Sequence, residues 1–482
     1  MKRIVFLVTL LFFQSLCLFP QLNEQEAFWL RVDALFSKIE LKNKDKEVIF
    51  SGQVFVNELK ANWQSHYELD EMIPQVNSLV EKMLERRLKP YEHIAPFLTT
   101  IVNLAILNAE QGQVKPFLDG VSYLLDQPGP SQLNDFYHIS NSLLRDSLLS
   151  RYKNINWKVS QIRFEIINYP TPRFKFKDID LICQMGSSRR KIYQTLGIYD
   201  PFSREWKGVG GQTPWVNNNI PSDSVYVEFD RYGIFLQGTD IQADSAMLYH
   251  KTYFPSGVMG KFEDNFKPGN KPGLPRFVSY DRNIKIPGIS QNVDFEGGVK
   301  LETHQLNGIG ESGRPARLFF YTPQKNRVVI KSQQFFFKNP FISALDANAT
   351  IRYRFDSIFH PAISFVYDEN KRQLNLYQGN SILSSLPFFS SYQRMEIQAN
   401  TLLWNIDDSL MIFKKGAGLV RENDAVFISE NYFRGEDFRT LQGIDPVNPL
   451  IRLYQLAKQL HKSQFGLNEY ASAIHLSADQ AE

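Results

Sequence analysis

The sequence predicts an α+β protein with an N-terminal helical bundle, a large all-β domain and a short C-terminal helical segment. Apolar residues recur at helical spacing over residues 23–150. From 155 to 440, strand-like alternation replaces that spacing. Aromatic residues make up 13% of the 482-residue chain, a content that suits β-sheet better than helical bundles. We therefore expect stacked antiparallel strands, arranged as a jelly roll or a solenoid.

Residues 1–19 have the layout of a secretory signal peptide. The basic residues Lys2 and Arg3 precede an apolar run, and Ser15 and Cys17 offer small residues for cleavage. The run is shorter than the roughly 20 apolar residues that a spanning helix needs. We expect cleavage, no transmembrane helix afterwards, and a location in the periplasm or at the cell surface of a Gram-negative bacterium. Lipidation at Cys17 is the alternative.

Cleavage would leave Cys183 as the lone cysteine of the mature chain. A single thiol cannot form an internal disulfide, so stability must come from the core. Its neighbours Leu181 and Ile182 are apolar, which favours a packed side chain over a nucleophile.

Apolar stripes predict the helices of residues 23–150. Each stripe has the i, i+3, i+4 spacing that places its members on one helix face. A bundle of four or five helices follows, with stacking in pairs as a further possibility, and such modules in envelope proteins usually bind partners. The stripes are Phe28, Val32, Leu35, Phe36 and Ile39; Met72, Val76, Leu79, Val80 and Met83; Ile94, Phe97, Leu98, Ile101 and Ala105; and Leu133, Phe136, Tyr137, Leu143 and Leu144.

Strand-like segments fill residues 155–440. Runs of β-branched and aromatic residues separated by polar turns predict both single strands and hairpins. The expected strands include 225–229 and 233–237, and the expected hairpins pair 363–367 with 373–377 and 401–406 with 409–413.

A short motif recurs within this β region. Residues 241–249 align with 345–353 and with 397–405. A glycine-containing stretch at 295–301 lies near the midpoint between the copies that start at 241 and 345. Evenly spaced strand units favour strands stacked in register. These motifs resemble the OstA-type β domains of the periplasmic lipopolysaccharide-transport family, over residues 225–415.

That resemblance implies an open jelly roll whose apolar interior holds acyl chains, with no catalytic residues. Two features depart from the family pattern. The loops are long, as at 253–290, and a helical module precedes the strands. These departures put lipid transport in question while leaving the β architecture as the expectation.

Residues 445–482 turn helical again. One face is formed by Leu450, Leu453, Tyr454, Ala457 and Leu460, and 467–476 reads as a second short helix. Residues 477–480 have the form of a capping box, which opens a helix. We expect this segment to be the start of a helix-turn-helix-like module in a longer protein.

The composition and motifs give no support for catalysis or nucleic-acid binding. Lys plus Arg total 54 against 51 Asp plus Glu, so the net charge of +3 provides no basic surface for a nucleic acid. No two of the eight His residues lie within five positions of each other. Residues 308–313 match G-x-G-x-x-G, but a strand follows, so we expect a loop between strands. We expect no enzyme activity, cofactor or metal.

Trp206 and Trp215 bracket a glycine-rich stretch and are the only candidate ligand-binding residues. Exposed indoles there would stack on a sugar ring, whereas buried indoles would cap the β core around a tight glycine turn. The second reading is favoured. The sequence thus predicts a secreted or periplasmic, non-enzymatic envelope protein that acts as a scaffold or binds lipid or other envelope proteins. The alternative is a carbohydrate-binding or carbohydrate-active protein that uses exposed Trp residues.

Overall fold

The computed structural model describes most of the chain and divides it into two compact units. Unit 1 comprises residues 1–318 with 332–342, and unit 2 comprises 319–331 with 343–482. The signal-peptide segment 1–19 and the capping-box segment 477–480 lie outside the described residues. The described residues are 23–473 except 46, 108–111, 216–223, 267–273, 323–326, 416–423, 430–448, 463 and 465.

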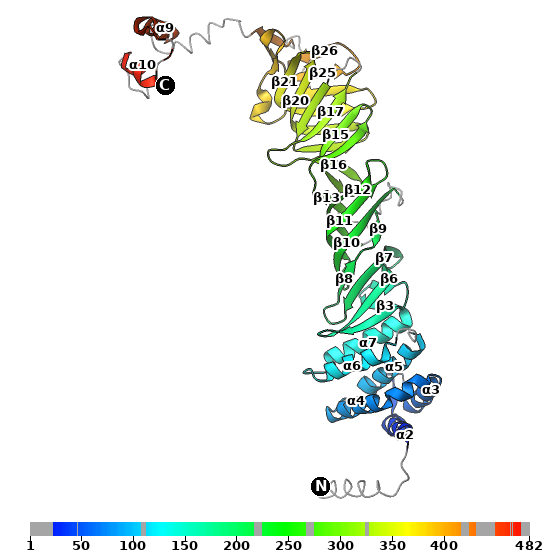
Figure 1. Cartoon of the computed structure of the whole chain (residues 1–482). Coiled ribbons are helices and arrows are strands. Elements are labelled where there is room, and N and C mark those ends of the chain that lie inside the picture. The colour runs from blue at the N-terminus through cyan, green and yellow to red at the C-terminus, as the bar shows by residue number, and fades with distance from the viewer. Residues whose placement is uncertain are drawn as a thin grey trace. The chain divides into compact units, whose positions relative to one another are not determined.

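The predicted fold class is confirmed. Among the described residues, an N-terminal helical region is followed by 25 antiparallel strands, β3 to β27, and then by two short C-terminal helices, α9 (Pro449–Leu460) and α10 (Leu467–Ala473) (Figure 1). Within the described part of the chain, no helix is both long and apolar enough to cross a bilayer.

The described part of the helical module contains six α-helices, more than the four or five expected: the four indicated by apolar stripes, and α3 and α6, which the stripes did not indicate. It also holds a small hairpin of β1 (Glu40–Lys42) and β2 (Val48–Ser51), a 3-10 turn, η1 (Tyr67–Met72), and a π turn, η2 (Pro90–Ile94). The α-helices are α2 (Glu24–Phe36), α3 (Gly52–Gln64), α4 (Ile73–Glu85), α5 (Ala95–Leu107), α6 (Val114–Leu125) and α7 (Ser131–Asp146).

These helices pack in two layers. Helices α2, α4 and α6 contact one another in sequence, and so do α3, α5 and α7 (Figure 1). Stacked rings fill the core: the Phe117 centroid lies 6.1 Å from that of Phe97 and 5.2 Å from that of Phe136. Phe136 in turn contacts Phe174 of the first sheet strands at 5.7 Å, so the helical core continues into the β core.

The strands begin at Leu148, before the expected start of the β region at 155. They are β3 (Leu148–Tyr152), β4 (Ile155–Val159), β5 (Phe164–Asn168), β6 (Pro172–Met185), β7 (Ser188–Asp200), β8 (Glu205–Val209), β9 (Gln212–Pro214), β10 (Val225–Phe235), β11 (Asp240–His250), β12 (Phe254–Asn265), β13 (Arg276–Ser279), β14 (Ile284–Ser290), β15 (Val293–Glu302), β16 (Gln305–Ile309), β17 (Ala316–Tyr321), β18 (Arg327–Ser332), β19 (Gln334–Lys338), β20 (Phe341–Tyr353), β21 (Asp356–Asp368), β22 (Gln373–Tyr377), β23 (Phe388–Ser390), β24 (Met395–Gln398), β25 (Thr401–Asn405), β26 (Met411–Lys414) and β27 (Val426–Ser429).

Several long strands bend without ending. In β10, Phe229 and Tyr232 are buried, whereas Asp230 and Arg231 between them are exposed. The pairing of β10 with β11 shifts register on either side of Arg231. The stretches expected as strands, 225–229 and 233–237, are thus strand residues as far as Phe235, but they belong to one continuous strand, because the two consecutive exposed residues between them form a bulge.

The same two-residue corner recurs in other strands. One corner residue adopts the left-handed conformation in β6, β7 and β20: φ is 50° at Asp178, 51° at Gln194 and 48° at Asp346. Each corner keeps the apolar residues before and after it on the buried face. Side chains in a strand alternate between the two faces, so two consecutive exposed residues would normally place the rest of the apolar residues on the opposite face. A bulge inserts one extra residue and restores the apolar residues to the buried face.

The internal repeat follows these corners, in a different frame from the one expected. Ala243 and Ala246 flank the corner of β11, and Ala344 and Ala347 flank that of β20. The sequence frame matched buried Ile241 with Leu345, which is 65% exposed. The third copy, 397–405, is split between β24 and β25. In β11 and β20 the motif therefore coincides with a bend in the strand. It does not correspond to a strand that recurs with the same residues buried in each copy.

Other sequence expectations are confirmed. The two hairpins form as β21 with β22 and β25 with β26. The G-x-G-x-x-G match begins in the last two residues of β16 and continues into the loop that leads to β17, where Glu311 forms a β-bridge with Arg314. Cys183 is buried in β6, and burial raises the pKa of its thiol to about 12, so it is a packed side chain and not a thiolate nucleophile.

Candidate functional site

Trp206 and Trp215 do not form a surface site. Both indoles are buried, with 0% and 1% of their surface exposed. The Trp206 Nε1–H donates to the Tyr232 hydroxyl at 3.1 Å, and the Trp215 Nε1–H donates to the Thr303 carbonyl at 2.6 Å. The alternative that needed exposed Trp residues is therefore wrong for this pair, and the reading of core indoles is confirmed.

The glycines between them are the reason for this burial. Gly210 and Gly211 have φ values of 66° and 95°, and they join β8 to β9 without reversing the chain. Both β8 and β9 pair with β7 on one side and β10 on the other. The glycines are thus another strand corner instead of the tight turn expected, and they place both indoles on the buried face.

Aromatic side chains occupy the interior of this part of unit 1. The Trp206 ring lies 5.6 Å from Phe176, and Phe262 lies 6.0 Å from Trp215 and 5.6 Å from Phe229. An acyl chain in this region would have to displace packed rings. This stretch of β structure is a filled core and suits a rigid support.

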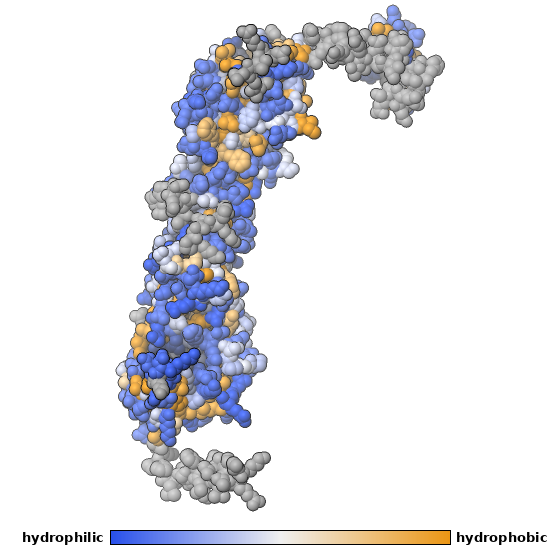
Figure 2. Space-filling model, turned by 180° about the vertical axis from the view of Figure 1, so that it is seen from behind, coloured by the Kyte–Doolittle hydropathy of each residue, from blue (hydrophilic) through white to orange (hydrophobic). Residues whose placement is uncertain are grey.

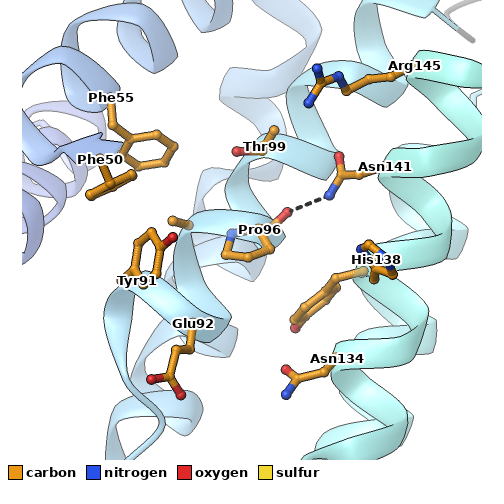
Figure 3. A pocket seen from close by; sticks show the side chains of 12 residues that line it. Phe50, Phe55, Tyr91, Glu92, Pro96, Thr99, Asn134, His138, Asn141 and Arg145 are labelled. Carbon is orange, nitrogen blue, oxygen red and sulfur yellow. Dashed lines mark hydrogen bonds between the residues drawn. The ribbon is translucent and has the colours of Figure 1, made fainter. Parts of the chain in front are cut away.

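A groove in the helical module is a concave surface of unit 1. Its volume is about 580 Å³, and it lies between η2 with α5 on one side and α7 on the other (Figure 3). Its lining residues are Phe50, Phe55, Tyr91, Glu92, Ala95, Pro96, Thr99, Asn134, Tyr137, His138, Asn141 and Arg145.

One wall of the groove is aromatic. The Phe50 ring, from β2, lies 5.6 Å from Phe55 of α3 and 4.7 Å from Tyr91 of η2. Phe55 is anchored from behind by buried Phe36 at 4.9 Å. Because the two Phe rings are half-buried and Tyr91 is 37% exposed, this cluster keeps apolar surface available to a ligand.

The opposite wall is a polar stripe along α7. Asn134, His138, Asn141 and Arg145 follow at i, i+4, i+7 and i+11, which places them on one face of the helix (Figure 3). Asn141 is fixed by its neighbours: its amide donates to the Thr100 hydroxyl at 2.8 Å and to the Pro96 carbonyl at 3.3 Å. This bonding ties α7 to α5 across the floor of the groove.

Tyr137 combines burial with an unused hydroxyl. Its side chain is 1% exposed, and its hydroxyl makes no hydrogen bond to any residue that the structure describes. Burial raises the pKa of Tyr137 well above its usual value, so the hydroxyl keeps its proton and is available as a donor. A buried polar group without a partner costs stability and calls for an explanation.

A second exposed surface lies in unit 2. The turn after β20 places Phe355 entirely in solvent, and the 3-10 turn η4 (Ile382–Ser385) exposes 90% of Ile382. Both segments adjoin β21: the turn that carries Phe355 leads directly into this strand, and η4 contacts it, with the Leu386 carbonyl bonded to His360. Orange apolar residues are visible over this unit in Figure 2.

The sequence did not reveal the groove. Tyr137 was expected only as a core residue, and the other lining residues come from five elements, β2, α3, η2, α5 and α7, spread over about a hundred residues of the chain. The sequence feature that could have indicated the groove is the polar stripe of α7, which lies beside the apolar stripe of the same helix. Among the described residues, no group of three or more His, Cys, Asp or Glu side chains is placed to hold a metal. No family model, curated protein or solved structure matches the chain.

Proposed function

We propose that this protein is a secreted or periplasmic, non-enzymatic envelope scaffold that docks a partner protein on its helical module. The groove between α5 and α7 carries the proposal, because it combines an exposed aromatic wall with a buried and unpartnered hydroxyl. Stacked helix pairs commonly present such extended surfaces to partners. The leader-like sequence of residues 1–19 supports a location outside the cytoplasm.

The filled β core supports the role of scaffold. Phe136 packs on Phe174, so the groove-bearing helix α7 is joined to the sheet through continuous core contacts. A partner held on the helices would therefore be held rigidly relative to the first strands. This arrangement favours a docking part on a supporting part within unit 1.

Lipid binding is the second candidate, and it rests on the apolar surface of unit 2. Phe355 and Ile382 are large apolar side chains that are almost wholly exposed. Burying each of them in a membrane interface would contribute about 1.5–3 kcal/mol. The bent antiparallel strands are also compatible with the OstA-like resemblance, in which β structure serves lipid transport.

Native mass spectrometry of the protein, purified gently from the cells that produce it, tests the proposal. We expect the chain to carry an added polypeptide mass, and Thr99→Arg to remove it, because an arginine at that position would fill the groove. Tyr123→Arg is the matched control, since Tyr123 is exposed on α6 and lies outside the groove.

The outcomes separate the two candidates. Retention of the polypeptide by Thr99→Arg, or its absence from the wild type, would contradict docking in the groove. Lipid adducts that disappear in Phe355→Asp/Ile382→Asp would instead favour the lipid-binding function.

A further inference from the structure

Two side chains that line the groove of the helical module, Tyr137 and Asn134, have hydrogen-bond donors with no acceptor among the described residues. The Tyr137 hydroxyl has no acceptor among the described residues. Asn134 uses its carbonyl oxygen on His93 Nδ1 at 2.6 Å, which leaves its amide N–H groups for a ligand. A ligand that fits must present acceptors in a row, as the carbonyl groups of an extended peptide do.

The two ends of the groove differ in charge. Glu92 lies near Asn134 at one end, where Lys89 neutralises it through a 2.7 Å ion pair (Figure 3). Arg145 lies at the other end, and it makes no ion pair with any residue in the described part of the chain. The unbalanced charge is therefore positive and belongs to Arg145, which suits a carboxylate.

The length of the polar stripe sets the length of the ligand. Eleven residues separate Asn134 from Arg145, which corresponds to about 16 Å along a helix. An extended peptide advances about 3.3 Å per residue, so about five residues span this distance. The aromatic wall at Phe50, Phe55 and Tyr91 faces the stripe and would accept one apolar side chain.

We infer that the groove binds an extended segment of about five residues from an acidic partner protein. An apolar side chain packs on the Phe50–Phe55–Tyr91 wall, a backbone carbonyl accepts from Tyr137, and an Asp or Glu side chain pairs with Arg145. This inference rests on the proposed docking function and specifies the chemistry of the partner. It also accounts for the unpartnered Tyr137 hydroxyl, which the ligand would satisfy.

An array of immobilised pentapeptides tests this inference with the full mature chain as the probe. Each peptide carries one Phe or Leu, with Asp, Lys or Ser at either end. We expect the chain to bind the Phe and Leu peptides that carry Asp, and to bind the Lys and Ser versions weakly. Arg145→Glu should reverse the preference from Asp to Lys, a change that unfolding cannot produce.

Two further variants sharpen the test. Tyr137→Phe keeps the ring but removes the donor, and we expect about tenfold weaker binding without loss of folding. Arg87→Glu makes the same charge change outside the groove and should leave the preference for Asp intact. Absence of binding by the wild type, or an Asp preference that survives Arg145→Glu, would overturn the inference. The docking function itself is tested separately by native mass spectrometry. If the wild type carries a bound polypeptide and Thr99→Arg loses it, the docking function stands even when the pentapeptides do not bind.

Discussion

Replacing Trp206 with alanine is expected to lower the free energy of unfolding by about 3–5 kcal/mol. The indole is wholly buried and packs on Phe176, and a Cβ atom on Gly197 would overlap it, so no nearby backbone can close the cavity without moving. The indole also donates to Tyr232, whose hydroxyl is 2.8 Å from Thr195. Urea unfolding followed by far-UV circular dichroism measures the loss.

Two controls accompany this prediction. Trp206→Phe retains a ring and should cost distinctly less than Trp206→Ala. Tyr169→Ala changes an aromatic residue that is 86% exposed, and it should stay within about 0.5 kcal/mol of the wild type. A loss below 1 kcal/mol in Trp206→Ala would show that the indole is not part of a packed β core.

Replacing Asp264 with asparagine is expected to stabilise the protein more at pH 7.5 than at pH 4.5, by about 2 kcal/mol. Burial raises the pKa of this carboxyl to about 6, although Arg190 and the Asn265 backbone N–H oppose the change. The Asp264 carboxyl therefore binds its proton more tightly in the folded state than in the unfolded state. Stability falls as pH rises from about 4 to 6, and the loss persists above that range.

The comparison of the two pH values isolates this carboxyl. Asparagine does not titrate, so the variant does not undergo the loss of folding stability that deprotonation of Asp264 causes as the pH rises. An equal effect of Asp264→Asn at pH 4.5 and 7.5, measured by urea unfolding, would contradict the burial of a protonated Asp264.

The predictable parts of the fold were those with a strong local period. The stripes of α2, α4, α5 and α7 identified those helices. The stripe of α6 was also present, with Phe117, Val121 and Leu124 on one face, but Pro116 and Gly120 weakened it as a helix signal. The strand corners were missed because Asp230 and Arg231 resemble a turn when pairing partners are unknown. Only the register with neighbouring strands shows that the chain continues.

The candidate site depended on contacts that a linear pattern does not contain. Trp206 and Trp215 were candidates because they bracket a glycine-rich stretch, yet burial decides their role. Tyr137 followed the apolar period and so was expected in the core, where it lies. What the period could not show is that its hydroxyl lacks a partner there.

Site-specific photo-crosslinking tests the central claim of partner docking most directly. A photoreactive benzoylphenylalanine placed at His138, which is exposed along the groove, should capture one defined polypeptide in the producing cells. The same residue placed at Tyr123 on α6 should not capture it. Capture at position 138 alone, lost on adding Thr99→Arg, is the predicted result. No adduct at position 138, or the same adducts at both positions, would contradict docking in the groove.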